Sequence, residues 1–109
     1  MASAKVIIPE GFHFVYGEKP EPTTCRYEDE DGALVTSIAG TTLAAVTSLN
    51  GATAVIVTCT NGGDGTFTID WPTDTSTFSA IGTISIRIRV TDTPKIWYMD
   101  KFKVSVEAV

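Results

Sequence analysis

The stretch that decides the fold is Thr83-Ile84-Ser85-Ile86-Arg87-Ile88-Arg89-Val90. Every even position in it is branched and apolar, and every odd position is polar, which is the period of a strand with one face in a core and the other in water. The same alternation runs through residues 65–71, where Phe67, Ile69 and Trp71 share one face. Both segments are therefore predicted to be half-buried strands.

Turn residues separate further short apolar segments on either side of these two strands. Asn50-Gly51 is a strong tight-turn dipeptide because both residues tolerate positive φ, and Asp31-Gly32 supplies a turn before a strand expected over residues 33–38. The seventeen threonines and the many Val and Ile residues also favour strands over helices. This spacing predicts an all-β protein, an Ig-like antiparallel β-sandwich of seven or eight strands with almost no helix.

The chain of 109 residues has the length of one domain, and residues 1–109 are predicted to form a single sandwich. Residues 1–8 are a candidate for an extended N-terminal arm, since the short strand Lys5–Ile8 is halted at Pro9. Val6, Ile7 and Ile8 could pair with the sheet edge of a neighbouring subunit. The alternative is that they complete a sheet of their own domain.

The charge of the chain argues against several classes of partner. Its net charge is -5, and its eight basic residues are scattered along the sequence, whereas nucleic-acid binding needs clustered cations. No apolar run approaches the roughly 20 residues of a membrane span, and the first apolar run is too short for a signal peptide. We therefore expect no nucleic-acid partner, no membrane partner and no export. Arg87 and Arg89 stand as paired cations and are a predicted docking contact.

The sequence offers little for catalysis. His13 is the single histidine, it lies on an alternating segment, and no Gly-x-Ser-x-Gly elbow is present. The acidic run from Glu28 to Asp31 is contiguous, so solvation rather than a raised pKa is expected there. The chain is predicted not to be an enzyme.

Metal and cofactor sites are not expected either. Calcium at Glu28, Asp29 and Asp31 is the alternative for the acidic run, but the spacing does not match an EF-hand loop. Cys25 and Cys59, with one histidine, do not make a four-ligand zinc site. The default for the two cysteines is a pair of small reduced core residues, and a disulfide between them is left open.

The aromatic residues near the C-terminus bear on binding. Trp97 and Tyr98 are adjacent, so on a strand they point to opposite faces and one of them must lie near solvent or an interface. Such a side chain could anchor a protein contact, or contribute to a sugar-binding platform. Trp71 is assigned to the core because it is in phase with Phe67 and Ile69.

Several segments carry a resemblance to a known family. They are Asp29-Glu30-Asp31-Gly32-Ala33-Leu34-Val35, Ile38-Ala39-Gly40-Thr41-Thr42, Gly65-Thr66-Phe67-Thr68-Ile69-Asp70-Trp71, Asp74-Thr75 and Ile81-Gly82-Thr83-Ile84. In this order they resemble small Ig-like structural domains of tailed bacteriophages, particularly the N-terminal domain of the baseplate upper protein family.

The resemblance implies a non-enzymatic virion structural protein, assembled in the host cytoplasm as a capsid decoration, tail or baseplate component. Its partners would be other phage structural proteins, in a homo-oligomer or multi-copy assembly. The alternative function is a carbohydrate or cell-surface binding module that uses exposed aromatics. The residues expected at the protein interface are Val6, Ile7, Ile8, Arg87, Arg89, Trp97 and Tyr98.

Overall fold

The computed structural model of the chain describes residues 4–9, 11–72 and 78–109. These residues form nine strands and one short 3-10 helix. The strands are β1 (Ala4–Ile7), β2 (Phe14–Val15), β3 (Thr23–Asp29), β4 (Thr42–Leu49), β5 (Val55–Asn61), β6 (Thr66–Ile69), β7 (Gly82–Asp92), β8 (Lys95–Tyr98) and β9 (Phe102–Glu107), and the helix η1 is Thr36–Ile38. In the described ranges no helix is long and apolar enough to cross a membrane.

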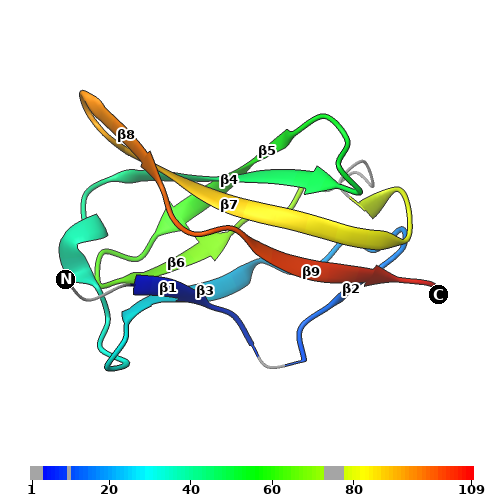
Figure 1. Cartoon of the computed structure of the whole chain (residues 1–109), viewed down its shortest axis with the longest axis horizontal. Coiled ribbons are helices and arrows are strands. Elements are labelled where there is room, and N and C mark those ends of the chain that lie inside the picture. The colour runs from blue at the N-terminus through cyan, green and yellow to red at the C-terminus, as the bar shows by residue number, and fades with distance from the viewer. Residues whose placement is uncertain (1–3, 10, 73–77) are drawn as a thin grey trace.

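The strands follow one another in the order β1-β3-β6-β5-β4-β7-β9-β2, and β8 pairs with β7 beside this path. All pairings are antiparallel except that of β2 with β9. Because β5 pairs with both β4 and β6, the sheet curls into two layers (Figure 1). We call them the β3 layer (β1, β3 and β6) and the β7 layer (β4, β7, β8 and β9). The predicted all-β sandwich is confirmed, with nine strands in the described residues rather than seven or eight.

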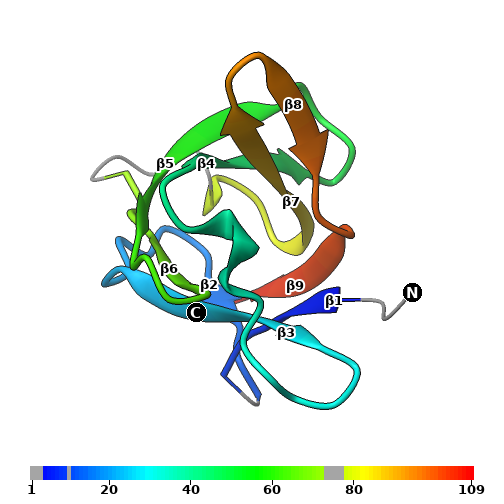
Figure 2. The same ribbon diagram turned by 90° about the vertical axis from the view of Figure 1, so that its left-hand side faces the viewer.

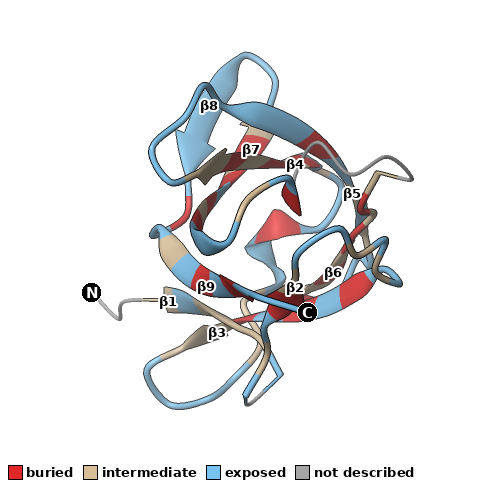
Figure 3. Ribbon diagram, turned by 90° about the vertical axis from the view of Figure 1, so that its right-hand side faces the viewer, coloured by how far each residue is buried: buried red, intermediate tan, exposed pale blue. Residues whose placement is uncertain are grey.

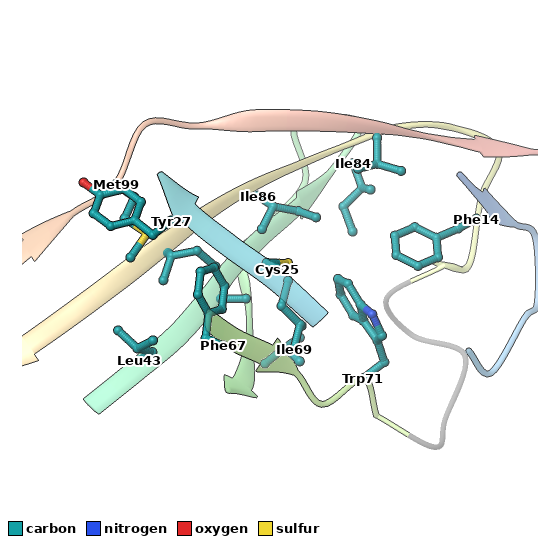
Figure 4. Packing of buried hydrophobic residues seen from close by; sticks show 14 of the residues in the cluster. Phe14, Cys25, Tyr27, Leu43, Phe67, Ile69, Trp71, Ile84, Ile86 and Met99 are labelled. Atoms are coloured by element: carbon teal, nitrogen blue, oxygen red, sulfur yellow. The ribbon is translucent and has the colours of Figure 1, made fainter. Parts of the chain in front are cut away.

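The core lies between the two layers, as the alternating pattern predicts. Ile84, Ile86, Ile88 and Val90 of β7 are at most 1% exposed and face the β3 layer. Buried stripes alternate with exposed ones along the strands, and the buried rings and branched side chains converge in the middle (Figures 3 and 4). Trp71 is 7% exposed and stacks edge-on against Phe14. The core assignment of Trp71 is therefore confirmed.

The Asn50-Gly51 turn joins β4 to β5 and also holds the start of β7. Both turn residues have positive φ, 53° and 78°. The Asn50 side chain accepts a hydrogen bond from the Thr83 N–H and donates one to the Ile81 carbonyl, each over 3.0 Å. A Cβ at Gly82 would collide with this side chain. Asn50 therefore fixes the β4–β5 hairpin to β7.

The prediction of a strand over residues 33–38 is wrong. Leu34 forms one isolated bridge with Glu28, and the chain then turns into η1. The Asn61 side chain donates hydrogen bonds to the carbonyls of Ile38 and Thr41, over 2.8 and 2.9 Å. These bonds hold a turn where the apolar pattern alone favoured a strand.

The N-terminal segment folds onto its own domain over residues 4–7. Val6 lies opposite Tyr27 in the antiparallel pairing of β1 with β3. Val6 and Ile8 are partly buried and pack against the core. The first three residues of the proposed arm lie outside the described residues, as do Asp74 and Thr75 of the family resemblance.

Candidate docking face

The outer face of the β7 layer brings two arginines together with apolar side chains. Arg87 lies opposite Val46 of β4, and Val46 lies opposite Ile56 of β5. Two residues further along β7, Arg89 lies opposite Tyr98 of β8. Ile56 and Tyr98 are 53% and 50% exposed. The strand register therefore places two guanidinium groups between an exposed aliphatic and an exposed aromatic side chain.

Two lysines extend this face toward β9. Lys103 lies opposite Ser85 of β7, whose side chain alternates outward with those of the two arginines. Lys101 and Lys103 also line a shallow hollow of about 300 Å³ with Ser48 and Ser85. We call the following four residues the cationic face: Arg87, Arg89, Lys101 and Lys103.

The four cations of the cationic face form no ion pair within the described residues. The ion pairs there join Arg26 to Glu28, over 2.8 Å, and His13 to Glu107, over 3.8 Å, and include none of the four cations. Two residues along a strand span about 7 Å. At that distance two unit charges in water repel by about 0.6 kcal/mol. The fold can accommodate this repulsion, and an anionic partner would relieve it.

The charge of the chain is unevenly distributed. Residues 81–106 contain five cations and two carboxylates, for a net charge of +3. The rest of the chain contains three cations and eleven carboxylates, for a net charge of -8. Five of the eight basic residues lie between residues 87 and 103, so the expectation that they are scattered is wrong, and the strand pairing gathers four of them on one face. The lysine pair has the same two-residue spacing as the arginine pair, but only the pairing of β9 with β7 places the two pairs on one face.

The predicted interface residues fall into two groups. Arg87, Arg89 and Tyr98 share the outer face of the β7 layer. Trp97 lies opposite Val90, on the other side of β8, with its ring centroid 6.4 Å from that of Tyr27. The N-terminal residues Val6, Ile7 and Ile8 belong to β1 and the segment after it, in the β3 layer. The structure therefore brings three of the seven together.

The hairpin of β7 and β8 projects beyond the body of the sandwich, as Figure 2 shows. Ile96 and Tyr98 on β8 are 61% and 50% exposed, and Trp97 is 36% exposed. Since Trp97 and Tyr98 point to opposite sides of the strand, they do not form one flat platform. This geometry gives no support to the predicted sugar-binding surface.

Two carboxylates of the acidic run are engaged in contacts within their own part of the chain. Glu28 is paired with Arg26, and Asp29 Oδ1 accepts hydrogen bonds from the N–H groups of Asp31 and Ala33, over 2.9 and 3.0 Å. The described ranges contain no group of three or more His, Cys, Asp or Glu side chains that could hold a metal ion. These carboxylates organise a turn instead.

The two cysteines are separate thiols in the core of the β3 layer and β5. Burial raises the pKa of the Cys25 thiol to about 12. Burial, with smaller contributions from Cys25 and Asp70, raises the pKa of the Cys59 thiol to about 12 as well. Because the thiolate is the form that binds metals, these protonated side chains are poor ligands at neutral pH.

Comparisons with known proteins support the fold alone. No family model matches the chain, and no curated protein matches it. Among solved structures, the crystal structure of CopC from Methylosinus trichosporium OB3b matches 96% of this chain and 94% of that chain. The TM-score is 0.55 at 14% sequence identity. The likeness shows a shared β-sandwich architecture.

This match corrects three expectations. The resemblance to the phage baseplate family is wrong, since the structural neighbour is CopC and no family model supports a phage domain. The virion role and the carbohydrate-binding alternative are not supported either. The segments that carried the resemblance are turns and alternating strands that many sandwiches share. The comparisons do not support the expectation of no cofactor either.

Proposed function

We propose that this chain is a non-enzymatic docking domain whose cationic face binds an acidic segment of a protein partner. The observation that carries the proposal is the gathering of Arg87, Arg89, Lys101 and Lys103 on one outer sheet face without an ion pair among the described residues. The rest of the chain is acidic, so a negatively charged partner is steered to this face and away from the other surfaces.

The neighbouring side chains suit a protein partner. Arginine and tyrosine are enriched among the residues that dominate binding energy at protein interfaces. A guanidinium can engage a carboxylate through two parallel hydrogen bonds. Tyr98 and Ile56 flank the arginines and offer apolar area to the backbone and side-chain stems of the partner. The face can therefore combine charge recognition with apolar burial.

The proposal can be tested with a fluorescently labelled poly-glutamate peptide as the probe. We expect its anisotropy to rise on addition of the protein at low salt, and the affinity to fall as salt increases. The double variant R87E/R89E should weaken binding at least about tenfold, the equivalent of roughly 1.4 kcal/mol.

The matched control is K5E/K19E, which changes the net charge equally at two exposed residues outside the cationic face. This control should retain most of the affinity. Equal weakening in both variants would mean that only net charge matters, and it would refute the proposed docking face.

Copper handling is a second candidate, favoured by the likeness to CopC. The residues in the described part of the chain do not fit such a site. The His13 ring nitrogen Nδ1 lies 3.8 Å from the Glu107 carboxylate, and burial keeps the two thiols protonated at neutral pH. Calorimetric titration of the whole chain with Cu(II), repeated with His13→Ala, tests this candidate directly. Stoichiometric binding abolished by the substitution would support copper handling, and an absence of heat would dismiss it.

A further inference from the structure

We infer that the occupant of the cationic face is the acidic tip of a second copy of this chain. By acidic tip we mean residues Glu28–Asp31, at the end of β3. The inference rests on the proposed function and names its partner. It predicts head-to-tail self-association, in which one copy offers its acidic tip and the next copy offers its cationic face.

The acidic tip presents two uncommitted carboxylates. Glu28 is bound to Arg26, and Asp29 Oδ1 accepts the two backbone N–H groups that close the turn. Glu30 and Asp31 are exposed, and within the described residues their carboxylates take no hydrogen bond or ion pair. Since the turn is already held by internal hydrogen bonds, little order would be lost when it docks.

The acidic tip and the cationic face match in charge and in form. Two carboxylates project from a convex turn, and two arginines lie beside a hollow lined by two lysines. The tip belongs to the β3 layer and the face to the β7 layer, and the turn after β3 and the β7–β8 hairpin lie on opposite sides of the molecule (Figure 2). The tip therefore cannot reach the face of its own copy, and only another copy can provide it.

Such a contact has predictable strength and symmetry. A turn docked on a sheet face buries far less than the roughly 1,200 Å² typical of stable complexes, so the association should be weak. Exposed charge pairs are screened by salt, so it should be salt-sensitive. Because the two surfaces differ, the contact is heterologous, and it propagates into chains or closes into rings rather than stopping at a dimer.

Sedimentation velocity of the whole chain at low and high salt tests the inference. At low salt we expect the weight-average sedimentation coefficient to increase with protein concentration, and at high salt we expect monomer. R87E/R89E and E30K/D31K should each remain monomeric at low salt, whereas the control K19E, at an exposed residue outside both surfaces, should still associate. Circular dichroism of every variant checks that the fold is intact.

Mixing two blocked variants gives the sharpest result. This mixture uses the neutral variants R87A/R89A and E30Q/D31N, because a charge-reversed face and a charge-reversed tip would attract each other. R87A/R89A keeps its acidic tip and E30Q/D31N keeps its cationic face, so one contact remains possible between them. The mixture should therefore form 1:1 dimers that grow no further, since the other tip and face of each dimer are blocked. Failure of this mixture to dimerise would contradict the assigned pair of surfaces.

The inference and the proposed function fail in different ways. If the wild-type chain is monomeric at low salt at all concentrations, or if E30K/D31K associates as well as wild type, the second copy is not the occupant. Binding of the poly-glutamate peptide would then still support the docking face. If the peptide also fails to bind, the docking function is refuted as well.

Discussion

The two faces of strand β7 obey different constraints. The inner face carries four side chains that are at most 1% exposed, and each of them fills space between the layers. The outer face carries Ser85, Arg87 and Arg89, whose side chains form no ion pair in the described parts of the chain. Packing between the layers therefore explains the inner residues, whereas no ion pair within the described residues explains the two arginines. The difference separates the residues that build the sheet from those that are free to bind.

The largest predicted effect comes from the inner face. Ile86→Ala removes a 1%-exposed side chain from the centre of the core, and we expect a loss of about 2 to 5 kcal/mol in the free energy of unfolding. That loss corresponds to a fall in melting temperature of roughly 10 to 20 °C for a domain of this size. Chemical denaturation measures it, and Ile86→Val is the matched control, with an expected loss of about 1 kcal/mol. Equal losses for the two variants would show that the site is not tightly packed.

A smaller effect is expected where the core contains a polar contact. The Trp71 Nε1–H donates a hydrogen bond to Thr23 Oγ1 over 2.8 Å, and both residues are buried. Trp71→Phe should lower the free energy of unfolding by about 1 to 3 kcal/mol because the Thr23 hydroxyl loses its partner. Adding Thr23→Val removes that unpaired hydroxyl, so the double variant should lose less than the sum of the two single variants. Strict additivity in the double-mutant cycle would mean that the hydrogen bond contributes nothing.

The buried thiols predict a pH dependence. Burial raises the folded-state pKa of Cys25 from 9.0 to about 12, so the protonated form is favoured in the folded state. Its contribution to stability is complete below pH 9 and is lost as the pH rises toward 12, because the unfolded state releases its proton first. Urea unfolding at several pH values should therefore show a steeper alkaline loss for wild type than for Cys25→Ala. Parallel pH profiles for the two proteins would contradict this assignment.

The smallest effect on stability is expected on the outer face. Arg87→Ala together with Arg89→Ala removes exposed or half-exposed charges that have no ion-pair partner in the described residues. Surface substitutions of this kind change the free energy of unfolding by about 0.5 kcal/mol or less. The same double variant should lose poly-glutamate binding in the anisotropy assay. A large loss of stability would show that the two faces of β7 are not independent.

The alternation of apolar and polar residues along the strands is sufficient to predict much of the fold. The period of two in the β7 segment assigned the four inner residues correctly, and the Asn50-Gly51 dipeptide located the β4–β5 turn. These features are local, so a sequence can report them. The turn after residue 33 could not be predicted in this way, because it depends on hydrogen bonds from the Asn61 side chain to residues 23 and 20 positions earlier in the chain.

The candidate docking face was predicted only in part. Arg87 and Arg89 were recognised because they share one strand and alternate with apolar residues. Lys101 and Lys103 reach the same face through the pairing of β9 with β7, which depends on the register between two strands. No local pattern reports that register. The family resemblance misled because turns and alternation specify an architecture and not a function.

Strand β7 changes partner halfway along its length. β9 pairs with it from Gly82 to Ile86, and β8 pairs with it from Arg89 to Asp92, with the Met99 N–H bonding to the Ile88 carbonyl between them. The first partner covers the core and the second forms the projecting hairpin. The molecule can therefore open in two cooperative units of different stability, the hairpin first and the sandwich later. A ligand that clamps Tyr98 and Arg89 would slow hydrogen exchange in β8 while leaving that of β9 unaltered.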